Sequence, residues 1–380
     1  MTAGRGRSGV PERLRVLHVD SERPWRGGER QILLLIRRQR RAGDEPHLAA
    51  PAGSAIALRA EAEGFPVHPV PMRGTWDLPS ALAIAALHRR LRPHVVHWHA
   101  AHAHALGTLA AILAPGPARV LSRRVDFPVR RSPGSRLLYA LLPEVIAAIS
   151  EGVRDVLIRS GVDPAGIRVV PSGIDLEPFE APVDRAALRE RLGIPEGVVL
   201  VLNVAALAPH KSQVDLLDAA ARLRARVPAL RIWIAGEGPL RALLLRRHEA
   251  LGLGDTVRFL GFRDDVEDLL RAADLFCISS HLEGMGTSIL DAMAAGLAVV
   301  ATRTGGIPEI VSPGETGILV PPSDPGALAG ALEQLGLDPE LRAAYGAAGR
   351  RRVRAYSADR TAERTREVYL EAWARRSRSG

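Results

Sequence analysis

Short apolar runs alternate with longer amphipathic stretches along the first half of the chain. The run LRVLHV at 14–19 is rich in Val and Leu and has polar flanks, which predicts a buried strand. The following segment RGGERQILLLIRRQRRAG predicts a glycine loop that opens a helix, with Gly43 at its end. Further strands are predicted at 94–99, 118–122 and 144–150, with helical stretches between them.

The same pattern restarts after residue 180. Glycine or polar loop residues and then a helical stretch follow each strand-like run, at 198–207, 230–236, 257–262, 275–280 and 297–302. Alternating strands and helices imply parallel sheets that are covered on both faces. We therefore predict an α/β protein with two doubly wound, Rossmann-like domains in tandem.

The segment SGIDLEPFEAPVD at 172–184 has no helical period and is expected to contain the domain boundary. We predict a first domain over 1–178, a second over 179–355 and a final helix within 356–380. Because ligands of such sheets bind outside the carboxyl ends of the strands, we expect the site in the cleft between the domains.

Composition is that of an ordinary globular protein, with 47% hydrophobic and 24% charged residues among 380. No apolar run approaches the roughly 18 residues that a membrane span needs. The first arginines are not followed by an apolar segment, so no secretory signal is expected. The single cysteine, Cys277, lies in the apolar run DLFCISS and is expected to be buried, which fits a reducing cytoplasm.

Charge is distributed unevenly. Residues 1–178 contain 25 Arg and 16 Asp or Glu, a balance of +9, and the rest of the chain is neutral. A basic half suggests an anionic partner, such as the inner face of a membrane, although an arginine-rich solvated surface explains it equally well. Aromatic residues make up only 4% and form no stripe with basic residues, which argues against nucleic acid.

The segment EGMGTSILDAMAAG at 283–296 carries the strongest chemical signal. It predicts a glycine turn and then a helix that begins near Thr287, with Thr287 as its N-cap and backbone N–H groups suited to phosphate. Glu283 and Asp291 flank this turn and are best explained as acceptors for hydroxyl groups. Phosphate beside several hydroxyls describes a sugar nucleotide, whereas an acidic first turn that only stabilises its helix is the alternative.

This segment resembles the carboxy-terminal signature of family 4 glycosyltransferases, which have the GT-B fold. The resemblance covers nearly the whole chain in the expected order, through WRGGERQ, HVVHWH, VVPSGIDLEPF, LAPHKSQVDLLDAA, GEGPLRALL and FLGFRDD. WRGGERQ together with LSRRVDFP looks most like the branch with lipopolysaccharide and other cell-envelope transferases.

The resemblance implies retaining transfer of a hexose-type sugar from a UDP- or GDP-sugar, without a metal or cofactor. It also implies that the C-terminal helix crosses back to the first domain. Lys211, the only lysine among 51 basic residues, would contact the diphosphate as a compact charge with three donors. Glu283 would bind hydroxyls of the donor sugar, and His99 would lie near that sugar and the reaction centre. The other donor-binding residues implied are Gly27, Gly28, Met285, Gly286, Thr287, Asp291, Phe262 and Arg263.

Two positions depart from the family pattern. Ala206 stands where the family often has an arginine five residues before the lysine, and Asp291 replaces a glutamate that would hold the ribose. Arg26, Arg123 or Arg124 is a candidate for the missing cation. The shorter Asp291 would reach the ribose after a small shift or through a water molecule.

Four histidines in HVVHWHAAHAHALG invite a metal-site interpretation, at positions 97, 99, 102 and 104. The chain turns from strand to helix between them, and no cysteine or nearby carboxylate completes a ligand set. We therefore predict no metal site, and we expect His94 and His104 on the surface.

The predicted function is thus a cytoplasmic glycosyltransferase, peripheral on the membrane if the basic half binds it. Its acceptor would be a glycan or a lipid-linked glycan, in lipopolysaccharide or cell-envelope polysaccharide synthesis. Two alternatives stay open: a sugar-nucleotide 2-epimerase, which would convert the donor without an acceptor, and a non-catalytic sugar-nucleotide-binding protein, which would release no UDP or GDP. A basic membrane scaffold would leave the glycine loops unexplained.

Overall fold

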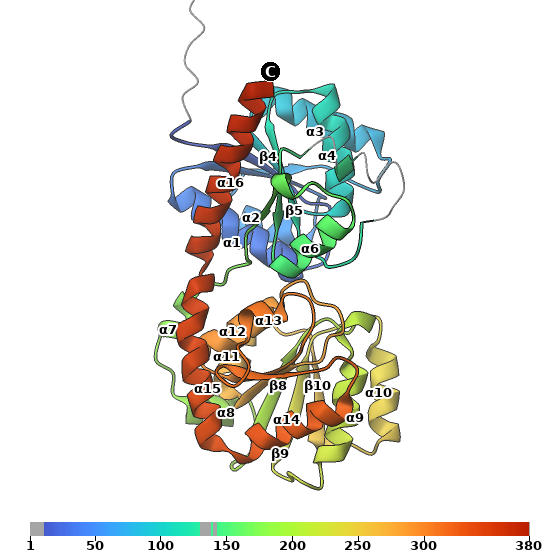
Figure 1. The fold of residues 1–380 in the computed structure, drawn as a ribbon, viewed down its shortest axis with the longest axis vertical. Coiled ribbons are helices and arrows are strands. Elements are labelled where there is room, and N and C mark those ends of the chain that lie inside the picture. Colours follow the sequence, from blue (N-terminus) through green and yellow to red (C-terminus); the bar gives the residue numbers. More distant parts are fainter. Residues whose placement is uncertain (1–10, 130–137, 140–142, 380) are drawn as a thin grey trace, which may run out of the picture. The chain divides into compact units, whose positions relative to one another are not determined.

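The computed structural model describes residues 11–129, 138–139 and 143–379, and the chain divides into two compact units. Unit 1 comprises Met1–Ser172 and Ala358–Gly380, and unit 2 comprises Gly173–Ser357 (Figure 1). The boundary lies at the start of the predicted linker rather than at 178/179, and a short helix, α7 (Glu177–Glu180), occupies part of that linker. No helix in the described ranges is both long and apolar enough to span a bilayer.

Unit 1 is built on a seven-stranded sheet with the order β3-β2-β1-β4-β5-β6-β7. All of its pairings in the described residues are parallel. Its strands are β1 (Arg15–Val19), β2 (Glu45–Ala50), β3 (Val67–Pro69), β4 (Val95–Trp98), β5 (Ala118–Arg123), β6 (Val145–Ala148) and β7 (Ile167–Val169). The helices along the first part of the chain are α1 (Gly27–Arg41), α2 (Ala55–Ala62), α3 (Leu78–Leu91), α4 (Ala101–Leu113) and α6 (Glu151–Arg159).

The C-terminal helix α16 (Ala358–Ser379) completes the core of unit 1. Its apolar side chains pack with strand residues such as Val16, Val95 and Val120. Tyr369 and Ala372 of this helix are completely or almost completely buried. The Arg366 guanidinium lies 3.1 Å from the Asp44 carboxylate, which adds an ion pair between α16 and the loop before β2. The last helix is therefore a structural part of the first domain.

Unit 2 contains a six-stranded sheet with the order β10-β9-β8-β11-β12-β13, again with parallel pairings. Its strands are β8 (Val199–Val204), β9 (Leu230–Ala235), β10 (Val257–Gly261), β11 (Leu275–Ile278), β12 (Ala298–Thr302) and β13 (Gly317–Val320). Its other helices are α8 (Arg185–Arg191), α9 (Gln213–Leu223), α10 (Arg241–Ala250), α11 (Val266–Ala272), α12 (Thr287–Ala294), α13 (Ile307–Ile310), α14 (Pro325–Leu337) and α15 (Pro339–Arg352).

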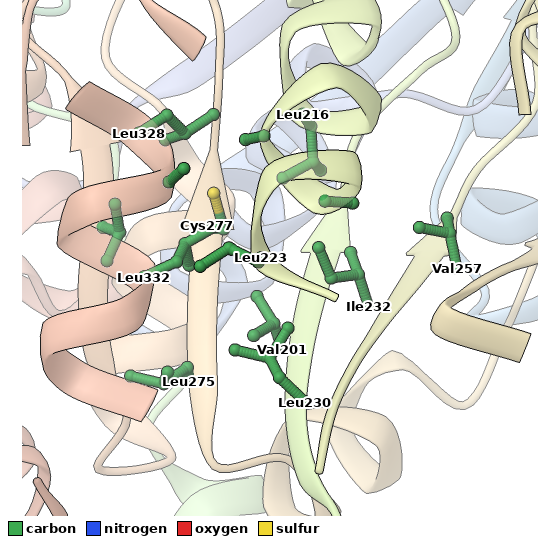
Figure 2. Close-up of a cluster of buried hydrophobic side chains, with 14 of the residues drawn as sticks. Val201, Leu216, Leu223, Leu230, Ile232, Val257, Leu275, Cys277, Leu328 and Leu332 are labelled. Carbon is green, nitrogen blue, oxygen red and sulfur yellow. The ribbon is translucent and has the colours of Figure 1, made fainter. Parts of the chain in front are cut away.

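One face of the unit 2 sheet packs against α9 and α14. Figure 2 shows Leu216 and Leu223 of α9 and Leu328 and Leu332 of α14 around the strand side chains. Cys277 lies in this cluster and is fully buried, as predicted, and burial raises the pKa of its thiol. Apolar burial of this kind is the main stabilising contribution to such a core.

The two parallel sheets confirm the predicted α/β class, and each predicted strand overlaps an observed one. Strands β2, β3, β7 and β13 were not predicted. Three of them are only three or four residues long, and β2 has the sequence EPHLAA, which lacks an apolar alternation. Their pairing with neighbouring strands, rather than their local sequence, makes them strands.

Candidate functional site

The order of strands in unit 2 reverses direction between β8 and β11. In open parallel sheets, such a reversal leaves a crevice outside the carboxyl ends of the two central strands. The 3₁₀ turn Pro209–Lys211 follows β8, and the segment from Ser279 to Glu283 follows β11. The fold therefore brings Lys211 and Glu283, which are 72 positions apart in sequence, to one point of the sheet edge.

Lys211 and Glu283 form an ion pair between Nζ and Oε2. Their side chains are only 16% and 13% exposed, so water screens the pair weakly. The Ser280 hydroxyl donates to the same carboxylate oxygen at 3.1 Å, and the Ser279 hydroxyl donates to the Lys211 carbonyl at 3.0 Å. These bonds hold a cation and a hydrogen-bond acceptor side by side in fixed positions.

The glycine turn after Glu283 leads directly into α12. Gly286 precedes the helix with φ of 79°, in the left-handed region, and a Cβ there would lie 3.0 Å from the Ile289 side chain. Gly286 is therefore the N-cap, and the predicted N-cap, Thr287, is the first helical residue. The prediction was wrong because the turn needs a positive φ, which glycine adopts without steric cost. Met285, within the turn, is buried.

The remaining residues predicted for unit 2 spread along the sheet edge. Asp291 is 3% exposed and lies one turn inside α12. Phe262 and Arg263 follow β10, the edge strand, and Phe262 is half exposed. Arg263 donates from Nε to Asp265 at 2.7 Å, and this bond raises the pKa of the guanidinium and lowers that of the carboxyl. The charge of Arg263 is thus already balanced.

Unit 1 has its own reversal of strand order, between β1 and β4. Gly27 and Gly28 are the first residues of α1, which follows β1, and the Glu29 carboxylate accepts from the Arg26 backbone N–H at 2.7 Å. His99 follows β4, and its backbone N–H donates to the Val19 carbonyl at 3.1 Å. The glycine loop and His99 therefore share the carboxyl edge of the two central strands.

The imidazole of His99 points into unit 1 and is only 7% exposed. Its Nε2 lies 2.9 Å from His18 Nδ1, and its Nδ1 lies 3.4 Å from Arg124 Nη2. Burial, together with His97, His18 and Arg124, holds the pKa of His99 well below its usual range, so the ring is neutral. A substrate group that bonds to this ring must first replace one of its present partners.

Three titratable side chains at this edge, Asp20, Glu29 and Arg124, were not predicted to act together. Asp20 follows β1 and is 1% exposed, and burial with the neighbouring Glu29 and Glu22 raises its pKa to about 8. Burial also raises the pKa of Glu29, while Arg124 lies nearby as the compensating cation. A polar residue directly after an apolar strand, as in LHVD, is the sequence signal that would have identified Asp20.

The structure groups histidines differently from the linear cluster. His18, His97 and His99 place one nitrogen each within 4.8 Å of one another, an arrangement that would allow a metal ion. Every ring nitrogen of these three residues already has a hydrogen-bond partner, so a metal would have to displace several bonds. His104 is buried against Trp98, which contradicts the predicted surface position, and His94 is half-buried.

Comparison with known proteins shows a glycosyltransferase family match for each unit. Residues 25–178 match the model for Glycosyltransferase Family 4, and residues 184–352 match the model for Glycosyl transferases group 1. The D-inositol 3-phosphate glycosyltransferase of Geodermatophilus obscurus is 32% identical over 332 residues, 84% of this chain and 70% of the relative. For three other curated relatives, the matched region spans only 51–62% of their length.

Solved structures show the same fold. The Anabaena protein Alr3699/HepE in complex with UDP-glucose has a TM-score of 0.83 at 23% identity, covering 93% of this chain and 98% of the neighbour. WaaG, a glycosyltransferase involved in lipopolysaccharide biosynthesis, has a TM-score of 0.73 at 16% identity, covering 93% and 99%. At these identities the likeness concerns the fold.

Proposed function

Because the chain belongs to the GT-B glycosyltransferases that join a family 4 domain to a group 1 domain, we propose that it is a retaining hexosyltransferase. The donor is a UDP- or GDP-sugar, bound as substrate, and the reaction uses no metal or cofactor. The acceptor is a hydroxyl of a glycan or lipid-linked glycan in cell-envelope synthesis. The UDP-glucose complex of a structural neighbour supports a nucleotide-sugar donor.

The paired Lys211 and Glu283 at the reversal point of unit 2 carry this proposal. In the proposed reaction, Lys211 turns from Glu283 to the diphosphate and stabilises the negative charge that develops on the leaving group. Glu283 is then released to accept hydrogen bonds from hydroxyls of the donor sugar. Ile289 N–H donates to the Gly286 carbonyl at 2.9 Å, and the backbone N–H groups that precede it at the start of α12 suit oxygen atoms of the donor.

Retention would follow from substitution on one face of the sugar. The leaving diphosphate stays beside the sugar, and its oxygen takes the proton of the incoming hydroxyl. The protein contributes positioning and charge stabilisation. In this proposal Gly27 and Gly28 approach the diphosphate, Asp291 holds the ribose, and Phe262 and Arg263 lie against the base.

We propose that unit 1 binds the acceptor and the membrane surface. Its basic excess suits an anionic lipid-linked glycan, and Trp76 and Leu78 at the start of α3 are 94% and 51% exposed. Amphipathic aromatic side chains beside basic residues favour a membrane surface. Binding to anionic liposomes that weakens with added salt would support this assignment, and salt-independent binding would refute it.

The first experiment is a thermal-stability panel of nucleoside diphosphates and their sugars, on the wild type and on Lys211→Ala. A stabilisation of several degrees by one base, lost in the variant, would support the donor site and identify the base. Binding without release of nucleoside diphosphate would favour the non-catalytic alternative, for which Ala206 and Asp291 are the supporting observations. Conversion of the donor without an acceptor would favour the epimerase.

A further inference from the structure

Seven buried or half-buried side chains of unit 1 form one continuous chain of hydrogen bonds. Arg124 Nη2 lies 3.4 Å from His99 Nδ1, His99 Nε2 lies 2.9 Å from His18 Nδ1, and His18 Nε2 lies 2.8 Å from Gln39 Oε1. Gln39 Nε2 lies 3.2 Å from the Tyr369 hydroxyl. That hydroxyl lies 2.8 Å from His97 Nδ1, and His97 Nε2 lies 2.8 Å from Ser122 Oγ.

Arg124 favours one direction of donation along this chain. A guanidinium has donors and no acceptor, so His99 Nδ1 must accept and His99 Nε2 must carry the proton. His18 then accepts at Nδ1 and donates from Nε2 to the Gln39 carbonyl oxygen. The Gln39 amide donates to the Tyr369 hydroxyl, which donates to His97 Nδ1, and His97 Nε2 donates to Ser122.

The opposite direction fails at one point only. It would require the Gln39 amide to be turned over and all three imidazoles to carry the proton on Nδ1. His99 would then direct an N–H group at the Arg124 guanidinium, donor against donor, in a buried place where an unmade bond is costly. Burial keeps all three rings neutral, so each has one donor and one acceptor nitrogen.

We propose that Arg124 sets, and Tyr369 of the C-terminal helix transmits, a single tautomeric state of the three histidines, with the proton on Nε2 of each. Tyr369, Gln39 and His18 are positioning residues in this scheme. His18 accepts from His99 Nε2, so that His99 Nδ1 presents an acceptor to the carboxyl edge of the sheet, and Gln39 and Tyr369 carry the same direction on to His97. Any ligand group that replaces Arg124 at this nitrogen must be a donor, such as a sugar hydroxyl, and this consequence rests on the proposed function.

The tautomers can be measured directly in the ligand-free full chain. Long-range proton–nitrogen correlation spectra of protein labelled with ¹⁵N-histidine distinguish the protonated ring nitrogen from the unprotonated one. The nine other histidines can be substituted singly to assign the three signals without touching the network. We expect all three rings to carry the proton on Nε2. This tautomer should be at least about tenfold more populated than the Nδ1 tautomer, because the Nδ1 tautomer would lose one buried hydrogen bond.

Transmission is tested with a double-variant cycle. Arg124→Met removes the group that sets the direction, so the tautomer of His97, five bonds along the chain, should become mixed. Tyr369→Phe cuts the chain, so His97 should become mixed while His99 keeps its proton on Nε2. In the double variant Arg124→Met/Tyr369→Phe, the His97 tautomer should be the same as in Tyr369→Phe alone, because the link between Arg124 and His97 is already broken.

Matched controls separate transmission from general disturbance. Arg123→Met removes the neighbouring arginine, which bonds to Tyr139 and the Phe127 carbonyl, and should leave all three tautomers unchanged. Tyr356→Phe removes a tyrosine hydroxyl bond in unit 2 and should do the same. Circular dichroism confirms that each variant is folded.

Two results would overturn the proposal: a proton on Nδ1 of any of the three rings in the wild type, or a His97 tautomer that ignores Arg124 while Tyr369 is present. Neither measurement involves a sugar donor or an acceptor substrate. A failure of the glycosyltransferase assignment would therefore appear in the stability panel and leave these spectra unchanged.

Discussion

The two units use the same sheet reversal to build opposite kinds of site. At the reversal of unit 1, neutral imidazoles bond to one another in a chain that ends at the Arg124 guanidinium, and the His99 ring has two partners. At the reversal of unit 2, a lysine and a carboxylate form a charged pair on short loops. The first arrangement fixes the orientation of the His99 ring before a ligand binds. In the second, the Lys211 ammonium is paired with Glu283 and can pair instead with an anionic ligand. The same backbone thus supplies preorganisation in one domain and charge in the other.

The largest expected effect is on the charged site. Lys211→Ala should reduce release of UDP or GDP from the donor by about 100- to 1,000-fold, as for loss of one charge-stabilising donor. Lys211→Arg should recover only part of this rate, because a planar fork replaces a compact ammonium. Turnover of the preferred donor measures both. Near-normal turnover of Lys211→Ala would refute the role of the pair.

Acid should destabilise unit 1 before unit 2. Burial lowers the pKa of His18 and His104 to about 4 and also lowers those of His97 and His99. In the unfolded chain these rings take up protons near pH 6.5, so stability is lost as the pH falls from 6.5 towards 4. Asp20 and Glu29, whose pKa values are raised, oppose this loss, but eight histidines of unit 1 have lowered pKa values and outnumber them.

The net loss between pH 6 and pH 5 should be at least about 3 kcal/mol, because His18, His97, His99 and His104 alone exceed the two acids by two groups and each uncompensated group contributes about 1.4 kcal/mol per pH unit. Hydrogen exchange should show the amides of unit 1 losing protection first. His104→Phe should reduce the slope by roughly 1.4 kcal/mol per pH unit. Equal loss of protection in both units would contradict this prediction.

The two glycine turns should respond oppositely to alanine. Gly286→Ala places a side chain at φ of 79° and 3.0 Å from Ile289, so it should destabilise the protein by about 1–2 kcal/mol. At Gly28 the nearest atom to a new Cβ is 3.9 Å away, an ordinary contact, and alanine favours the helix. Gly28→Ala should therefore be neutral or stabilising. Denaturant midpoints of both variants test the contrast.

The smallest expected effect comes from adding a cation to unit 2. Ala206→Arg should strengthen binding of the nucleoside diphosphate by about tenfold, the size of one charge-assisted hydrogen bond. Calorimetry with the base identified in the stability panel measures the change. Ala206→Gln is the control, since it adds length without charge. Equal affinities of the two variants would mean that position 206 does not face the diphosphate.

The sequence by itself determined the fold class and most of the strands, because buried parallel strands are apolar runs separated by loop residues. It also predicted a site role for Lys211 and Glu283, through an isolated lysine and a glycine turn whose order resembles a known family, and the fold pairs the two side chains. It did not predict short strands such as β13, because their formation depends on a neighbouring strand. Nor did it predict that Gly286, rather than Thr287, caps α12.

Only the tertiary structure decided which polar groups meet inside unit 1. His18, Gln39, His97 and Tyr369 come from two strands and two helices, and no local pattern links Tyr369 to His97 across 272 positions. A hydrogen bond depends on the separation and direction of two atoms, which the packing of α16 against the sheet sets. The chain's residues therefore indicated which polar groups were available, and the fold decided which of them bond to one another.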